Sequence, residues 1–153
     1  MTYSKQGKTR ILFLCTGNSC RSQMAEGLAN AIHGDILEAH SAGIERHGMN
    51  PQAVQVMNEA GIDMSAHRSK TIDVVDLQSF DFIITVCDHA HESCPVVPEG
   101  CRVIHQGFDD PPRLAGNLQD KEEILTCYRR VRDEIKNYIR KLPEQVLKER
   151  KDP

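Results

Sequence analysis

The chain has 153 residues, enough for a core of its own, and we expect a single domain over residues 1–153. Its formal net charge is −3 and it carries no long basic stripe, which argues against nucleic acid as a partner. No apolar run is long enough for a signal peptide or a membrane span, so we expect a cytoplasmic protein without a membrane partner. Six cysteines in such a chain favour catalysis, redox chemistry or metal binding over a disulfide framework.

Short apolar runs alternate with helical periodicity along the chain, a pattern that predicts an α/β domain built on a parallel sheet. The predicted strands are residues 10–14, 36–40, 82–86 and 102–105. The predicted helices before the last one are residues 22–33, 51–61 and about 71–77.

The last helix is marked by one apolar stripe with alternating steps of four and three residues. Its members are Ile124, Tyr128, Val131, Ile135, Tyr138 and Leu142. We expect Pro143 to interrupt this helix, the core to span about residues 9–142, and the charged tail from residue 149 to fray.

The segment between the first strand and the first helix reads C-x5-R, from Cys15 to Arg21. Gly17 and Asn18 can adopt positive φ, so the loop can curl its N–H groups around an anion. The helix that begins near Ser22 adds the positive end of its dipole, and Arg21 offers a planar fork for a tetrahedral oxyanion. The same field favours the thiolate of Cys15, which is the reactive form. We therefore predict a catalytic element with Cys15 as its nucleophile.

The predicted oxyanion-binding loop consists of Thr16, Gly17, Asn18, Ser19, Cys20, Arg21 and Ser22. Ser19 and Ser22 either donate hydrogen bonds to the thiolate or cap the helix. Asn18 either shapes the loop through its side chain or only supplies a left-handed residue, and Cys20 need not face the anion.

Three further candidates follow predicted strands. Cys15, Cys87 and the pair Asp109-Asp110 each come after a strand, and in open α/β sheets ligands bind outside those strand ends. Asp110 precedes Pro111, which favours an extended backbone, so its carboxyl can protonate a leaving oxygen; the alternative is a plain turn.

Cys87 and Cys94 are separated by six residues. A disulfide needs Cα atoms within about 7 Å. Seven residues of helix span roughly 10 Å, so pairing would require this segment to loop or unwind, as in a redox switch. The alternatives are two unrelated thiols, or a zinc site with His89 and His91, although that spacing is not a standard zinc-finger spacing.

The other candidates read as structural. Residues 41–43 and His47 follow the second strand, and Cys101 and Cys127 have no reactive setting. The histidines without a chemical constellation are His33, His40, His67 and His105.

Four segments together, CTGNSCRSQMAEG, HSAGIERHGMNP, ITVCDHAHESCP and HQGFDDPP, resemble the thioredoxin-coupled arsenate reductases. The resemblance covers roughly residues 9–140, and that family shares the fold of low-molecular-weight protein tyrosine phosphatases. It implies a four-stranded parallel sheet flanked by helices, no cofactor, and arsenate as the substrate.

The resemblance also implies roles for the candidate residues. Cys15 attacks arsenate held by the loop amides and Arg21, and Asp110 protonates the departing hydroxide. Cys87 then attacks the Cys15 adduct and arsenite leaves. Cys94 next attacks Cys87, and thioredoxin reduces the Cys87–Cys94 disulfide. Glutaredoxin or a small thiol is the alternative reductant, and we expect a monomer.

One position departs from some relatives. They bind potassium near the loop through positions that match Asn18, Glu26, Ser41 and an aspartate, and Lys70 stands in place of that aspartate. We expect the Lys70 ammonium group to contact Glu26 and Asn18, and we expect no potassium site.

Two rival functions stay open. A tyrosine phosphatase needs only Cys15, Arg21 and Asp110, but Gln23 replaces the proline usual after the C-x5-R-S run, and Cys87 and Cys94 have no task in it. Residual phosphatase activity is compatible with the loop. An oxyanion-binding or redox-sensing module would bind without turnover.

Overall fold

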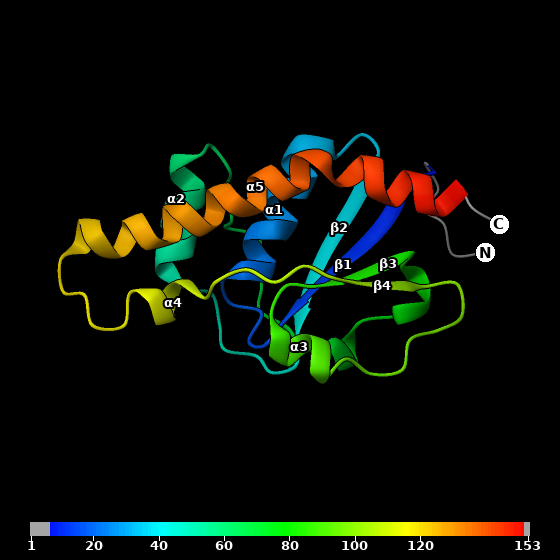
Figure 1. Ribbon diagram of the computed structural model, residues 1–153, viewed down its shortest axis with the longest axis horizontal. Coiled ribbons are helices and arrows are strands. Elements are labelled where there is room, and N and C mark those ends of the chain that lie inside the picture. The colour runs from blue at the N-terminus through cyan, green and yellow to red at the C-terminus, as the bar shows by residue number, and fades with distance from the viewer. Residues whose placement is uncertain (1–6, 152–153) are drawn as a thin grey trace.

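The computed structural model describes residues 7–151, with side chains through residue 148. Its sheet is parallel and has the strand order β2-β1-β3-β4 (Figure 1). The strands are β1 Thr9–Cys15, β2 Leu37–Gly43, β3 Phe82–Thr85 and β4 Arg102–His105. The helices are α1 Arg21–His33, α2 Pro51–Glu59, α3 Asp88–Glu92, α4 Pro111–Leu114 and α5 Lys121–Lys151, with 3-10 turns η1 Ile72–Val74 and η2 Leu77–Ser79.

The predicted sheet is confirmed, with two differences in the elements. Strand β2 continues through Gly43, so residues 41–43 belong to the strand instead of following it. The helix expected near residues 71–77 is wrong, because that stretch forms the two short turns η1 and η2, which contain no buried residue. A helix without a buried face lacks the packing that normally stabilises it.

The continuous apolar runs mark the two central strands. In β1, the side chains of residues 11–14 are fully buried, and all four residues of β3 are buried as well. Strands buried on both faces read as unbroken apolar runs, as parallel strands under helices do. Figure 1 shows α5 running over α1, which packs against β1 and β2, while α3 lies against β1 and β3. The loops after β1, β3 and β4 therefore meet at one edge of the sheet.

Helix α5 corrects two expectations about the last helix. Leu125 and Ile139 belong to its fully buried stripe, where the sequence pattern suggested the half-buried Ile124 and Tyr138. Pro143 does not interrupt the helix, which continues past the buried Val146 to Lys151.

The reason is a replacement hydrogen bond across the α1–α5 contact. A proline cannot donate to the carbonyl four residues earlier, here that of Ile139. His33 at the end of α1 occupies this acceptor, with its Nε2 at 3.0 Å from the Ile139 oxygen. The helix keeps its direction because the carbonyl that Pro143 leaves unbonded has another donor.

In the part of the chain that the structure describes, no helix combines the length and the apolar character that crossing a bilayer would require.

Candidate active site

The loop after β1 is fixed by hydrogen bonds through its carbonyl groups. Thr16, Gly17 and Ser19 accept from backbone N–H groups of residues 45, 47 and 50, at 2.8, 2.9 and 3.1 Å. Within residues 7–151, the N–H groups of residues 17–20 have no acceptor. Carbonyls that face the protein leave these donors free for an anion, which is the arrangement that binds phosphate-like ions.

Only one of the two predicted positive-φ residues adopts that conformation. Asn18 has φ of 48°, whereas Gly17 stays outside the left-handed region. The close approach at Gly17 has another reason, since a Cβ there would lie 2.2 Å from Nδ1 of His47, whose ring would have to turn away. The shape of the loop therefore depends on the close approach of His47 to Gly17 and on the left-handed backbone conformation of Asn18.

A directed hydrogen-bond chain ends at the Cys15 thiol. Asn18 Nδ2 donates to Ser22 Oγ at 2.9 Å, and Ser22 Oγ lies 2.8 Å from Cys15 Sγ. Because Ser22 accepts from the amide, its own proton is free to point at the sulfur. Helix α1 has Cys20 at its N-cap and no side-chain cap. Of the two roles considered for Ser22, the geometry supports donation to the sulfur.

We expect the Ser22→Ala variant to lower kcat/KM for the reaction at Cys15 by about tenfold or more, because a hydrogen bond to a charged group is worth ~1.5 kcal/mol or more. The matched control is Ser65→Ala, on the surface outside the site. Equal rates for Ser22→Ala and the wild type would show that the thiolate does not depend on this bond.

Arg21 and Asp110 approach each other at the mouth of the loop. Arg21 Nη2 lies 3.6 Å from Asp110 Oδ1, and Nη1 donates to the carbonyl of Phe108 at 2.9 Å. Asp110 has φ −87° and ψ 110°, the extended backbone expected before Pro111. The Arg21 side chain is largely buried, while that of Asp110 is 38% exposed. The Asp110 carboxyl is therefore in contact with solvent and also borders the anion-binding loop.

Cys87 lies beside the loop although it is 71 residues away from it in sequence. Its Sγ is 3.3 Å from Thr16 Oγ1 and accepts from the N–H of Ala90 at 3.4 Å. Both Cys15 and Cys87 are buried. A cavity of about 700 Å³ is lined by residues that include Thr16, Arg21, Cys87 and Asp110, and one of about 310 Å³ is lined by the loop and Asp110. Cys87 thus borders the larger cavity and Cys15 the smaller one, and the two cavities share Thr16, Arg21 and Asp110.

Cys94, like the fully buried Asn18 and Ser22, lines neither of these cavities. It follows α3, is half-buried and is a free thiol, like the other five cysteines. Burial raises the pKa of the Cys94 thiol. Among the residues described, no cluster of three or more histidine, cysteine or acidic side chains is arranged to hold a metal ion.

The thiols differ in their tendency to ionise. Burial, followed by the charge of Asp110, raises the pKa of Cys20 far above its usual range. Burial and then Asp81 raise the pKa of Cys101 to about 11. At pH 8, roughly one Cys101 thiol in a thousand is therefore ionised.

Timed alkylation with iodoacetamide at pH 8, followed by peptide mass spectrometry, should modify Cys20 last and Cys101 slowly, because only the thiolate reacts. Denatured protein is the control, in which all six cysteines should react at similar rates. Rapid native labelling of Cys20 would contradict the burial of this thiol.

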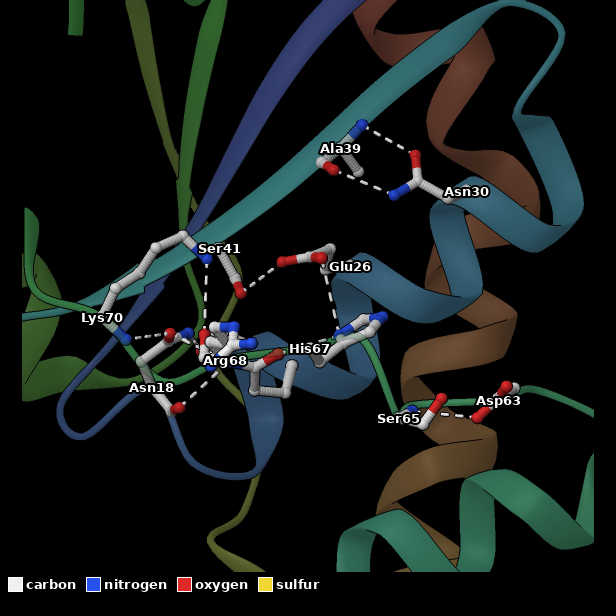
Figure 2. A network of polar contacts seen from close by, with 12 residues as sticks. Asn18, Glu26, Asn30, Ala39, Ser41, Asp63, Ser65, His67, Arg68 and Lys70 are labelled. Atoms are coloured by element: carbon white, nitrogen blue, oxygen red, sulfur yellow. Dashed lines mark hydrogen bonds and ion pairs between the residues drawn. The ribbon is translucent and has the colours of Figure 1, made fainter. Parts of the chain in front are cut away.

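The network behind the loop differs from the expected one (Figure 2). Lys70 does not bring its ammonium group to Glu26: its Nζ contacts the carbonyl of Arg68 at 3.5 Å, and its backbone N–H donates to Asn18 Oδ1 at 2.9 Å. Glu26 accepts from Ser41 Oγ at 2.6 Å and lies 3.5 Å from His67 Nδ1. The predicted contacts of the ammonium group are therefore wrong.

Gln23 and His67 are the residues of this network that sequence reasoning did not identify. The fully buried Gln23 amide donates to Asn18 Oδ1 at 2.9 Å and to the carbonyl of Arg68 at 3.0 Å, while its oxygen lies 2.9 Å from His67 Nδ1. The sequence shows Gln23 as a polar residue two positions after Arg21, but it does not show the partner, because His67 lies 44 residues further along the chain.

The absence of a potassium effect stays a prediction. Turnover in potassium chloride should equal turnover in choline chloride at the same ionic strength, because hydrogen bonds within the chain already satisfy Asn18 and Ser41. A clear rate increase with potassium alone would contradict this expectation.

Comparison with known proteins is consistent with the geometry. The model of the family "Low molecular weight phosphotyrosine protein phosphatase" matches residues 10–152. An arsenate reductase of Halalkalibacterium halodurans is 49% identical over 90% of this chain and 96% of its own length. One from Bacillus subtilis is 48% identical over 88% of this chain and 94% of its own.

Solved structures give the same picture. An arsenate reductase from Archaeoglobus fulgidus superposes with a TM-score of 0.69 at 34% identity, covering 86% of this chain and 97% of that one. A thioredoxin-dependent arsenate reductase from Corynebacterium glutamicum superposes at 0.68 with 25% identity, covering 94% and 64%. The chain therefore belongs to the low molecular weight phosphotyrosine protein phosphatase family, and its sequence groups it with the arsenate reductases of that family.

Proposed function

We propose that the protein reduces arsenate to arsenite through three cysteines that act in sequence, with thioredoxin as the final reductant. The observation that carries this proposal is the position of Cys87, whose buried sulfur lies 3.3 Å from Thr16 Oγ1 in the loop of the nucleophile Cys15. A phosphatase requires one thiol at this place. A second thiol at the edge of the loop that holds the first is what a thiol–disulfide relay needs.

In the first step, the loop N–H groups and Arg21 bind arsenate, and the Cys15 thiolate attacks arsenic. One oxygen leaves as water after it takes a proton from Asp110, which lies 3.6 Å from Arg21 at the mouth of the loop. The Ser22 hydroxyl, 2.8 Å from the sulfur, stabilises the attacking thiolate.

In the second step, the Cys87 thiolate attacks the Cys15 sulfur. The sulfur–arsenic bond breaks and its electron pair stays on arsenic, which falls from As(V) to As(III) and leaves as arsenite. A Cys15–Cys87 disulfide remains, so two thiols have supplied the two electrons.

In the third step, Cys94 attacks the Cys87 sulfur, releases the Cys15 thiolate and forms a Cys87–Cys94 disulfide. The five-residue helix α3 lies between these residues, so we expect this segment to rearrange when the bond forms. The dithiol of thioredoxin then reduces this disulfide and takes up the oxidising equivalents.

One observation supports thioredoxin as the reductant: the C. glutamicum neighbour is a thioredoxin-dependent arsenate reductase. A relay that cycles between thiols and transient disulfides suits a reducing compartment, so we expect a cytoplasmic setting.

The test is arsenite production from arsenate with thioredoxin, thioredoxin reductase and NADPH, with a parallel assay on p-nitrophenyl phosphate. The proposal predicts many arsenite molecules per protein and only slow phosphate ester hydrolysis at the same loop. Efficient hydrolysis without arsenite would assign the protein to the phosphatases, and arsenite production with glutaredoxin but not thioredoxin would replace the proposed reductant.

A further inference from the structure

The short helix α3, which separates Cys87 from Cys94, is attached to the sheet by a cluster of polar groups outside the catalytic loop. Thr85, fully buried at the end of β3, places its Oγ1 at 2.8 Å from His105 Nδ1 and at 3.3 Å from His91 Nδ1. The two imidazole rings stack with centroids 4.4 Å apart and an interplanar angle of 29°. His105 Nε2 lies 3.0 Å from Asp88 Oδ1, at the first residue of α3.

The protons of this cluster can be assigned from the acceptors. An ionised Asp88 only accepts, so His105 carries its proton on Nε2. The Thr85 hydroxyl then donates to Nδ1 of a neutral His105 at 2.8 Å in preference to the Ile104 carbonyl at 3.4 Å, and its oxygen accepts in turn from His91 Nδ1–H. Each group thus donates to the next: His91 on α3 donates to Thr85 on β3, Thr85 donates to His105 on β4, and His105 donates to Asp88 on α3.

Helix α3 has little else to hold it in place. It contains five residues, and a helix of that length is unstable on its own. Its only fully buried side chain is Ala90, while Cys87 caps its first turn through the N–H of Ala90. The two attachment points, Asp88 and His91, lie between Cys87 and Cys94. A rearrangement of this segment therefore acts directly on them.

We propose that Asp88, His91 and His105, gathered around Thr85, form a latch that holds α3 in its helical form. The closed latch keeps the Cys87 sulfur beside Thr16, and its opening lets Cys94 reach Cys87. We assign these as positioning residues that act through α3. His91 and His105 line neither cavity, and Asp88, although it borders the cavity of about 700 Å³, is bonded to His105. The role of the latch in disulfide transfer rests on the proposed relay. Its attachment of α3 to the sheet is independent of that relay.

The test uses His105→Phe, which keeps a flat ring against His91 and removes both nitrogen bonds. Hydrogen exchange measured by NMR on the reduced protein reports α3 directly, since the N–H groups of His91 and Ser93 donate to the carbonyls of Cys87 and His89. We expect exchange at these two amides to be about tenfold faster in His105→Phe. The matched control is Glu92→Ala, exposed on the same helix, which should exchange as the wild type does.

A second readout follows disulfide formation without arsenate. Oxidation by diamide, quenched by alkylation and mapped by mass spectrometry, should produce the Cys87–Cys94 bond several-fold faster in His105→Phe than in the wild type. Asp88→Ala changes a side chain that is 90% exposed, so it removes no buried packing, and it should shift both readouts in the same direction by a smaller amount.

Unchanged exchange and unchanged oxidation in both variants would overturn the latch. Faster exchange with an unchanged rate of Cys87–Cys94 formation would limit the cluster to supporting α3 and reject its role in transfer. Because neither readout uses arsenate, a wild-type protein that makes no arsenite would contradict the proposed function and leave the result on α3 intact.

Discussion

The Cys15→Ser variant should produce no measurable arsenite, a loss of about 10⁴-fold or more, and should still bind arsenate. A serine hydroxyl is not ionised at neutral pH, so the attacking group is lost. The anion-binding groups remain, because the loop is held through carbonyls that accept from residues 45, 47 and 50. Arsenite assays and titration calorimetry with arsenate measure the two properties separately.

The control for this variant is Cys127→Ser, a half-buried thiol on α5 away from the loop, which should retain full turnover. Arsenite production by Cys15→Ser would show that another thiol attacks arsenate. Loss of arsenate binding along with activity would instead make the sulfur part of the binding site.

The Cys94→Ser variant should stop after at most one arsenite per protein molecule. In the proposed relay, Cys15 and Cys87 complete the first two steps, and the resulting disulfide joins two residues that are buried. A partner protein cannot reach it there, so multiple turnover requires the transfer to Cys94, which follows α3 outside the cavities. Arsenite counted per protein, with thioredoxin present, checks this expectation.

Cys101→Ser is a matched control seven residues further along the chain, and it should turn over like the wild type. Its thiol has a pKa of about 11 and no role in the relay. Multiple turnover by Cys94→Ser equal to that of the wild type would remove Cys94 from the mechanism.

The parts of the fold that follow from local pattern were predictable. The buried runs of β1 and β3 are apolar throughout, so they could be recognised without knowledge of their neighbours. The carboxyl ends of parallel strands share one edge, which was enough to place Cys15, Cys87 and Asp110 together.

The features that depend on distant partners were not predictable. Pro143 reads as a helix break until His33 is seen to bond the Ile139 carbonyl. The long side chain of Lys70 could have turned towards Glu26, and only the folded backbone decides that His67 lies there instead.

The histidines around α3 show the same limit. His91 and His105 are 14 residues apart in sequence, and nothing in that spacing predicts that their rings meet. Their stacking depends on the β3–β4 pairing and on the position of α3, both of which are properties of the assembled sheet.

The most direct test of the relay is to follow the disulfides of the reduced wild-type protein after one equivalent of arsenate, without thioredoxin, by rapid alkylation and mass spectrometry. The proposed relay predicts that a Cys15–Cys87 disulfide forms first and decays into Cys87–Cys94, with one arsenite released per protein. A final product that retains Cys15–Cys87, or arsenite release with Cys87 still a free thiol, would contradict it.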